Sequence, residues 1–279
     1  MKPCLNSKWM IAAVAAASLA TAGCTKLQAR DALNKGVASF KAAKYDAAVE
    51  YFKTAKEKDP TLTNARLYLA TAYATMYIPG APSEENVRNG EMAIKEFREV
   101  LQTDPNNLGA IDGIGSILYN MGGTPYDPKK FEESRSYHQK HIQISPNDPD
   151  PYYWIGVINW TLAFRANNQM RKEYNDLNSK DLKDVDPLPA KVRDGFKQYY
   201  ETTVDEGITA LEKAIQLNPE YDSAYAYLNL LYRQKADMDA DKAAREEHLA
   251  KADSLIEQFK VIKQKKMEKE AQKAGAPGA

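Results

Sequence analysis

The chain carries the phrase Gly36-Val-Ala-Ser-Phe40, Tyr45-Asp-Ala-Ala-Val-Glu-Tyr-Phe52, Asp59-Pro60, and weaker copies of it follow downstream. The copies end at Asp104-Pro105, Ser145-Pro146 and Asn218-Pro219. A phrase that recurs in this way indicates a repeat array, in which each repeat buries its apolar face against its neighbours.

Apolar residues within the phrase follow helical spacing, which predicts two antiparallel helices joined by a short turn. We expect the first helix from about Ala29 to Ala42 and the second from about Asp46 to Lys58. Small residues such as Gly36 and Ala48 allow the helices to approach closely. Pro60 ends the second helix, because proline cannot continue the helical hydrogen-bond ladder.

This spacing resembles the tetratricopeptide repeat (TPR). That repeat has a small residue at its eighth place, alanine at its twentieth and twenty-seventh, an aromatic residue at its twenty-fourth and proline at its thirty-second. The resemblance implies an all-α superhelix of about five helix-turn-helix repeats with insertions. The first repeat, 29–62, departs from the family at Ala32 and Lys35, where large apolar residues are usual. The other repeats are expected at 63–107, 108–148, 149–221 and 222–260.

Insertions lengthen the later repeats at 78–88, 122–128 and 166–206. The motif Ser83-Glu-Glu-Asn86 predicts an early helix start within the first of them. In the longest, Asp184 to Ala190 predicts a turn-rich link, and 192–206 can join the helix that follows. The array is expected to span 29–260, and the basic stretch 261–279 is predicted to be a disordered tail.

The first 23 residues predict a secretory signal rather than a part of the fold. Lys2 and Lys8 precede an apolar run of about 15 residues, which is shorter than the roughly 20 residues that a membrane-spanning helix needs. The ending Ala22-Gly-Cys24 resembles the lipobox of bacterial lipoproteins, although Thr21 stands where that family usually has Leu. A plain cleaved signal and an uncleaved anchor remain alternatives.

The lipoprotein resemblance implies cleavage before Cys24, acyl chains such as palmitate on that residue, and a short anchored linker at 24–28. Two or more acyl chains attach a protein stably to a membrane. Thr25 follows the cysteine, whereas Asp at that place favours retention at the inner membrane in the family. The expected location is therefore the bacterial cell envelope, with the chain on the outer membrane and facing the periplasm.

Composition and motifs argue against several other classes of protein. The chain has 38 basic and 38 acidic residues, whereas a nucleic-acid surface usually brings a basic excess. No nucleophile elbow, Walker loop or His-Glu-x-x-His motif occurs, so we expect no enzyme, no catalytic residue and no cofactor. His138 and His141 could share a helix face, but no third ligand is evident, and we expect no metal site.

In TPR proteins the first helix of each repeat lines a concave groove, through its second, fifth, ninth, twelfth and thirteenth places. The resemblance carries this role to Phe40, Thr71, Tyr119, Asn120, Tyr153, Trp160 and Arg233. Leu33 and Val37 stand where some family members use Lys and Asn to clamp a peptide carboxylate, so that clamp is not expected. Aromatic residues of such arrays also form the core, which remains the other interpretation of Tyr153 and Trp160.

The predicted function is a membrane-anchored periplasmic scaffold that binds a protein or peptide through the groove, in envelope assembly or secretion. The alternative is an envelope receptor for a solute or glycan. It would bind its ligand in the aromatic groove and use the 166–206 insertion as a lid.

Overall fold

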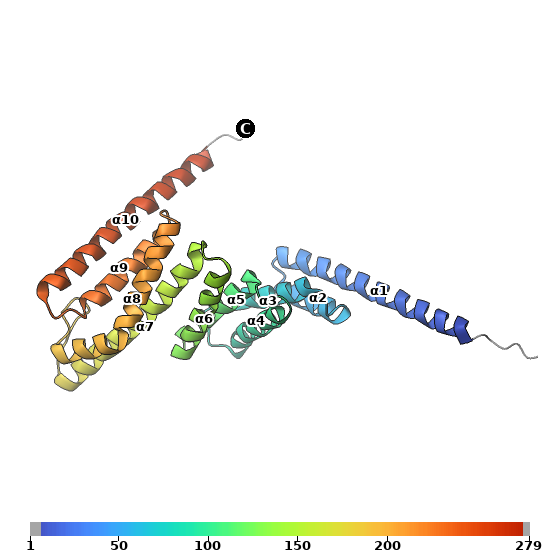
Figure 1. The fold of residues 1–279 in the computed structure, drawn as a ribbon, viewed down its shortest axis with the longest axis horizontal. Coiled ribbons are helices and arrows are strands. Elements are labelled where there is room, and N and C mark those ends of the chain that lie inside the picture. Colours follow the sequence, from blue (N-terminus) through green and yellow to red (C-terminus); the bar gives the residue numbers. More distant parts are fainter. Residues whose placement is uncertain (1–6, 276–279) are drawn as a thin grey trace, which may run out of the picture. The chain divides into compact units, whose positions relative to one another are not determined.

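The structure of the chain is a computed structural model that describes the backbone of residues 7–275 and the side chains of residues 24–272. Within these residues it has ten α-helices and no strand, which confirms the all-α prediction (Figure 1). The chain forms two compact units, unit 1 (Met1–Asp127) and unit 2 (Pro128–Ala279). The boundary falls inside the third predicted repeat, between its two helices.

Unit 1 contains the first five helices, and consecutive helices pack on one another. They are α1 (Ser7–Lys41), α2 (Tyr45–Lys58), α3 (Thr63–Met76), α4 (Glu84–Thr103) and α5 (Leu108–Gly123). Helix α4 begins early, as predicted, because the Ser83 side chain accepts a hydrogen bond from the backbone N–H of Asn86. This is the usual N-cap arrangement.

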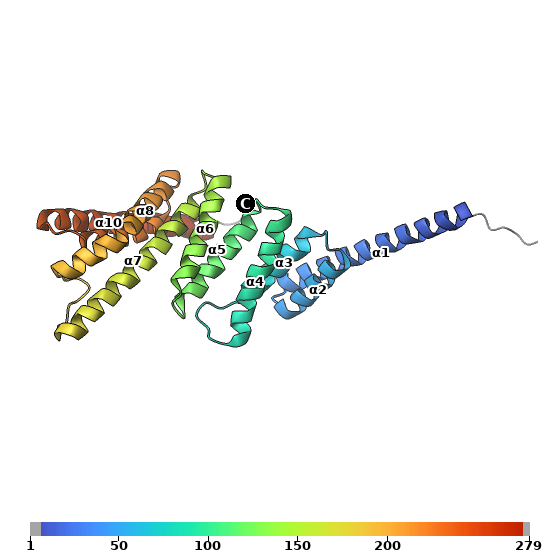
Figure 2. The same ribbon diagram turned by 60° about the horizontal axis from the view of Figure 1, so that its bottom comes forward.

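Unit 2 contains the other five helices, and here too neighbours in sequence are neighbours in space. Figure 2 shows the longest contact, where α7 and α8 lie side by side. The helices are α6 (Pro128–Ile144), α7 (Pro149–Asn178), α8 (Ala190–Leu217), α9 (Asp222–Ala236) and α10 (Lys242–Gly275).

One turn recurs at four helix ends, and each time it contains the proline of the repeated phrase. The residue before the proline closes the helix, since its backbone N–H donates to the carbonyl oxygen four residues earlier; these residues are Asp59, Asp104, Ser145 and Asn218. Its own carbonyl oxygen accepts a hydrogen bond from the N–H three residues later, at 3.0, 3.2, 3.2 and 3.0 Å, from Leu62, Asn107, Asp148 and Tyr221 respectively. Proline suits the second place of such a turn because its φ is already near the required value. An x-Pro dipeptide therefore forms the same chain-reversing turn between repeats in all four places.

Glycine allows the two helices of a pair to touch. A Cβ atom at Gly36 would lie 2.5 Å from the ring of Phe52, and one at Gly156 would lie 2.3 Å from Cγ of Leu211. Both distances are shorter than any contact a real Cβ makes, and Phe52 and Leu211 are fully buried. The small residue at the eighth place of the repeat is therefore a packing requirement.

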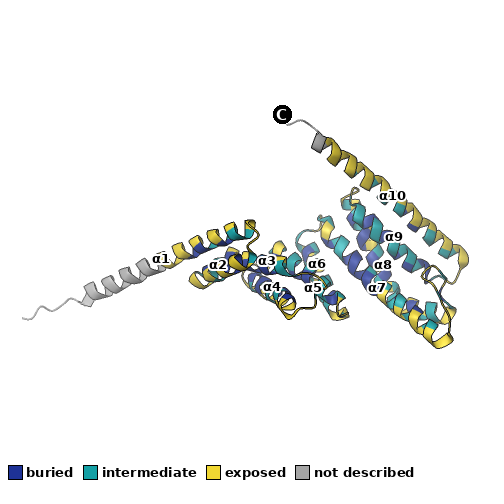
Figure 3. Cartoon of the chain, turned by 180° about the vertical axis from the view of Figure 1, so that it is seen from behind, coloured by how far each residue is buried: buried dark blue, intermediate teal, exposed yellow. Residues whose placement is uncertain are grey.

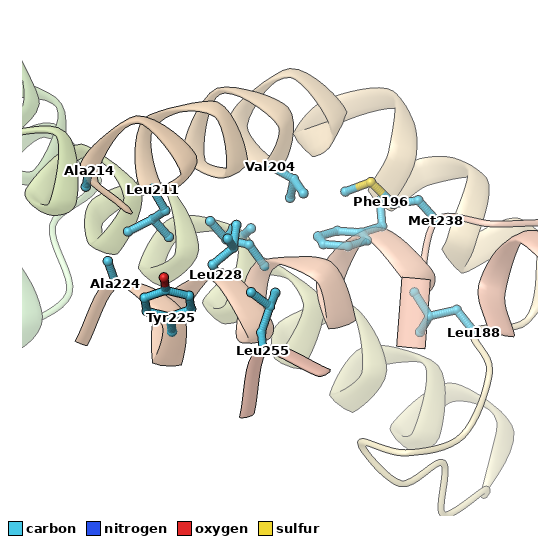
Figure 4. Close-up of a cluster of buried hydrophobic side chains, with 12 residues drawn as sticks. Leu188, Phe196, Val204, Leu211, Ala214, Ala224, Tyr225, Leu228, Met238 and Leu255 are labelled. Carbon is cyan, nitrogen blue, oxygen red and sulfur yellow. The ribbon is translucent and has the colours of Figure 1, made fainter. Parts of the chain in front are cut away.

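The long insertion forms no lid. Residues 166–178 extend α7 and residues 190–206 extend α8, so the insertion lengthens one helical hairpin and only 179–189 is a loop. Figure 4 shows how that loop is attached, because Leu188 lies with Phe196 and Met238 in the apolar core of unit 2. The insertion is therefore part of a packed helix pair whose loop is anchored in the core, and not the lid supposed for a glycan receptor.

A buried ion pair also holds the loop 179–189 in place. Nη1 of Arg171 donates to the carbonyl oxygens of Lys183 and Asp186, at 2.7 and 3.0 Å. Its Nη2 donates to Oδ2 of Asp237, at 2.8 Å, and both side chains are nearly inaccessible to solvent. The guanidinium thus joins the tip of the α7–α8 hairpin to the end of α9.

The basic tail differs from its prediction. The segment 261–275 is helical, because α10 continues to Gly275. Ion pairs attach it to the start of α9, from Lys266 to Asp222 at 2.6 Å and from Lys269 to Glu220 at 2.7 Å. Figure 3 shows that α10 is otherwise largely exposed over residues 261–272.

The N-terminal boundary also differs. Residues 24–28, predicted as a linker, are part of α1, which continues without a break to Lys41. The predicted signal segment, 1–23, lies outside the residues whose side chains are described. The first buried residue is Ala29, at the expected start of the array.

Two histidines fill core positions of α6. His138 is fully buried, and its ring stacks on Trp154 of α7, with 5.8 Å between ring centroids and 8° between planes. Neither ring nitrogen of His138 has a hydrogen-bond partner among the described residues. Burial, and to a lesser extent the nearby His141, lowers the pKa of His138 to about 4. The imidazole is therefore neutral at pH 7 and packs as an aromatic ring.

The glycine contact predicts opposite effects for two similar substitutions in unit 2. Gly156→Ala should destabilise the protein by about 1 to 3 kcal/mol, because Leu211 must move from a close-packed position. Gly195→Ala should stabilise it by about 0.5 to 1 kcal/mol, since Gly195 lies in α8 with nothing within 4 Å of an added Cβ. Urea denaturation measures both, and equal effects of the two changes would contradict the packing argument.

The buried histidine predicts acid sensitivity. The pKa of His138 is lower in the folded state than in the unfolded chain. Its contribution to the free energy of unfolding is therefore constant above about pH 6.5 and is lost as pH falls toward 4. The full loss is about 3 kcal/mol.

Denaturation at pH 7.0 and 4.5 tests this. His138→Phe keeps an aromatic ring on Trp154 and should lose less stability than the wild type on acidification. A wild-type pH dependence in His138→Phe would show that another group is responsible.

Candidate peptide-binding surface

An apolar pocket opens in unit 1 between the first helices of the array. Its volume is about 490 Å³, within the range of pockets that hold small ligands. The lining residues come from α1, α2, α3 and the first turn of α5: Val37, Phe40, Lys41, Phe52, Leu67, Tyr68, Thr71 and Gly109.

The pocket brings together two of the predicted groove residues, Phe40 and Thr71. Phe40 is half-buried and makes an edge-to-face contact with Tyr45, at 5.3 Å between ring centroids. The hydroxyl of Thr71 donates to the carbonyl oxygen of Leu67, at 2.8 Å. This hydroxyl is already satisfied, so Thr71 presents mainly its methyl group.

Two further predicted residues, Tyr119 and Asn120, lie on α5 near its C-terminal end and are half-buried. Neither is among the residues that line the pocket. Their predicted role as groove residues stays a prediction.

Tyr153 and Trp160 belong to an aromatic cluster of unit 2. Tyr153 stacks on Tyr221, with ring centroids 4.9 Å apart, and Trp160 stacks on Phe164, at 5.0 Å. The edge of Tyr227 contacts both, at 5.8 Å from Tyr153 and 5.2 Å from Trp160. The ring faces are largely used on one another, and this favours a packing role over a binding role.

The hydroxyl of Tyr221 lies beside an acidic side chain. Burial, followed by the charge and hydrogen bond of Asp150, raises the pKa of Tyr221 well above its usual value. The phenol therefore stays protonated and joins the start of α7 to the start of α9.

Arg233, the remaining predicted groove residue, is engaged within unit 2. Its Nε donates to Oδ1 of Asn229 at 3.0 Å, and its Nη2 donates to Oδ1 of Asp253 on α10 at 2.6 Å. The side chain is 43% exposed, so the pair is solvated and contributes little stability. It nevertheless ties the guanidinium to α10.

Cys24, the predicted lipidation site, is exposed on α1 as a free thiol. No helix in the described part of the chain is long and apolar enough to cross a membrane. Among the same residues, no three His, Cys, Asp or Glu side chains are grouped so that they could hold a metal ion.

Val37 and Leu67 of the pocket also stand at groove places of the repeat, whereas the other four lining residues were missed as groove residues from sequence. Lys41 is at the thirteenth place of the first repeat, which is a groove place of the family. Gly109 is at the second place of the third repeat, which is also a groove place, whereas Tyr68 and Phe52 are at places that the family pattern does not assign to the groove. They line the pocket because Tyr68 lies on the buried Phe52 ring, at 5.7 Å between centroids, and because Gly109 has no side chain to fill it.

Comparison with known proteins supports the fold. No known family profile matches the chain, and no curated protein does. Solved structures do resemble it. The MamA protein has a TM-score of 0.56 and 16% sequence identity, over 86% of this chain and 94% of that one.

Two other structures agree. MamA residues 41 to the end from Desulfovibrio magneticus RS-1 has a TM-score of 0.52 and 18% identity, over 82% of this chain and 96% of that one. YrrB, a TPR protein with an unusual peptide-binding site, has a TM-score of 0.51 and 13% identity, over 85% of this chain and 90% of that one. Because the sequence identities are this low, the likeness concerns the fold alone. The chain has the helical-repeat fold of TPR proteins.

Proposed function

We propose that the chain is a lipid-anchored adaptor of the bacterial envelope, which binds a segment of a protein partner in the unit 1 pocket. The observation that carries the proposal is the pocket itself. It is apolar, it has a volume of about 490 Å³, and Phe40 and Thr71 occupy groove places of the repeat. The resemblance to YrrB, whose structure has a peptide-binding site, supports the same use of the fold.

The membrane part of the proposal is supported by the sequence around Cys24. Cleavage before Cys24 would make the acylated cysteine the first residue of the remaining helix, and would leave the array on the membrane surface, facing the periplasm from the outer membrane. The exposed sulfur of Cys24 is accessible to a modifying enzyme, and the sequence Ala22-Gly-Cys24-Thr25 supports lipidation and outer-membrane sorting.

The glycan-receptor alternative has less support. Sugar rings bind on free aromatic faces, whereas Tyr153, Trp160 and their neighbours stack on one another. The insertion that would close over a ligand is part of the α7–α8 hairpin. A scaffold without a reaction centre is also consistent with the absence of catalytic motifs in the sequence.

The lipid anchor has a direct test. Cells that express the chain should incorporate a palmitate analogue into the wild-type protein and into Cys4→Ser, but not into Cys24→Ser. The two variants each remove one of the two cysteines, so Cys4→Ser is the matched control. Label in Cys24→Ser would refute lipidation at this residue. Density-gradient separation of the two membranes then gives the location.

The pocket has an equally specific test. Two glycines of α5 have room for a larger side chain, and only one of them lines the pocket. Gly109 lines the pocket, and an added Cβ there meets only Oδ1 of Asn107 at 3.5 Å, while Gly123 has nothing within 4 Å. Gly109→Phe puts a ring at the pocket and should reduce partner binding at least about tenfold. Gly123→Phe should leave binding unchanged.

The measurement is affinity capture from envelope extracts of the native host with the 25–279 fragment, followed by quantitative mass spectrometry. A set of captured proteins that is the same for wild type, Gly109→Phe and Gly123→Phe would show that the pocket binds no partner.

A further inference from the structure

The unit 1 pocket has one charged lining residue, Lys41. Its side chain is exposed, and no ion pair or hydrogen bond of its ammonium group occurs among the described residues. Other cations of unit 1 do have carboxylate partners, in the pairs Lys35–Asp31, Lys53–Glu50, Lys56–Glu96 and Arg66–Glu99. Within the described residues, Lys41 thus places a cation without an internal carboxylate partner beside an apolar pocket.

Among the other lining residues, only Thr71 and Tyr68 have a side-chain hydrogen-bonding group. The hydroxyl of Thr71 is used within α3, and the ring of Tyr68, which is 42% exposed, rests on Phe52. Such walls favour an aliphatic or aromatic side chain, whose burial contributes about 1.5 to 3 kcal/mol. The volume of about 490 Å³ suits one or two large side chains rather than a whole domain.

The partial charge at the start of α5, near Gly109, has the same positive sign as the charge of Lys41. Gly109 lies in the first turn of α5, which has 16 residues, and it is exposed beside the Asn107 side chain that caps the helix. The start of a helix carries a partial positive charge. It adds to the attraction that Lys41 exerts on an anion, although the pocket and Lys41 carry the argument.

We propose that the occupant of this pocket is a segment of a protein partner in which a large apolar side chain lies within one helical turn of an Asp or Glu. The apolar side chain fills the pocket and the acidic side chain pairs with Lys41. The inference rests on the proposed function and names the chemistry of the partner. A terminal carboxylate is the less suitable anion, because Leu33 and Val37 occupy the places of the family's carboxylate clamp.

Selection from a random library of 12-residue peptides tests the inference. Each peptide is displayed with both ends fused to a carrier, so that no terminal carboxylate is present. The bait is the full chain in lipid nanodiscs, and empty nanodiscs remove peptides that bind lipid. Peptides selected on the wild type should carry Asp or Glu within four residues of a large apolar residue more often than the unselected library does.

A charge reversal provides the sharper measurement. Lys41→Glu should weaken binding of a selected peptide by about three- to tenfold, since an attraction at a solvent-exposed rim is replaced by repulsion. Changing the acidic residue of that peptide to Lys should restore binding to Lys41→Glu. Lys95→Glu is the matched control, because Lys95 is also exposed in unit 1 but lies on α4 outside the pocket.

The outcomes separate the two proposals. If selected peptides lose binding with Gly109→Phe but bind Lys41→Glu as well as the wild type, the acidic partner is wrong and the pocket remains a binding site. If peptides bind only when a free terminal carboxylate is restored, the inference is also wrong. If no peptide is selected, or if Gly109→Phe changes nothing, both the inference and the binding role of the pocket are refuted.

Discussion

The rest of the structure depends on the turn that follows each second helix. Its hydrogen bond, as from the N–H of Leu62 to the carbonyl of Asp59, reverses the chain within four residues. Proline cannot extend the helix before it and favours the turn after it. Because this turn recurs at four joints, helix ends are set locally. Packing then has only to select which helix faces meet.

Contacts between paired helices add the second constraint. Gly36 and Gly156 let the backbone of a first helix lie on a buried side chain of its partner, Phe52 or Leu211. A larger residue would separate the pair and expose apolar surface on both helices. Phe52, on which Gly36 lies, also lines the unit 1 pocket, together with groove residues of α1 and α3. The pocket is thus a consequence of close packing behind it.

The insertion shows how an added segment can keep this plan. Residues 166–206 continue the helices on both sides, so the α7–α8 hairpin becomes longer and only 179–189 is a loop. Its loop is fixed by Leu188 in the core and by the Arg171–Asp237 pair. Removing one partner of a buried ion pair leaves an uncompensated charge. Both Arg171 and Asp237 are therefore needed to hold the loop 179–189 in its position. Hydropathy alone could not distinguish this hairpin from a lid.

The sequence by itself determined the all-α class, the helix ends at the x-Pro dipeptides and the early start of α4, because caps, turns and proline act within a few residues. Only the tertiary structure decided which side chains stay free. Arg233 contacts Asp253, Tyr153 and Trp160 stack on aromatic neighbours, and Lys41 has no ion-pair partner within the described part of the chain. Asp253, Tyr221 and Tyr227 lie on other elements than the residues that they contact, and the distances of these contacts depend on how the helices pack. Periodicity can place a residue on a helix face, but it cannot show what already covers that face.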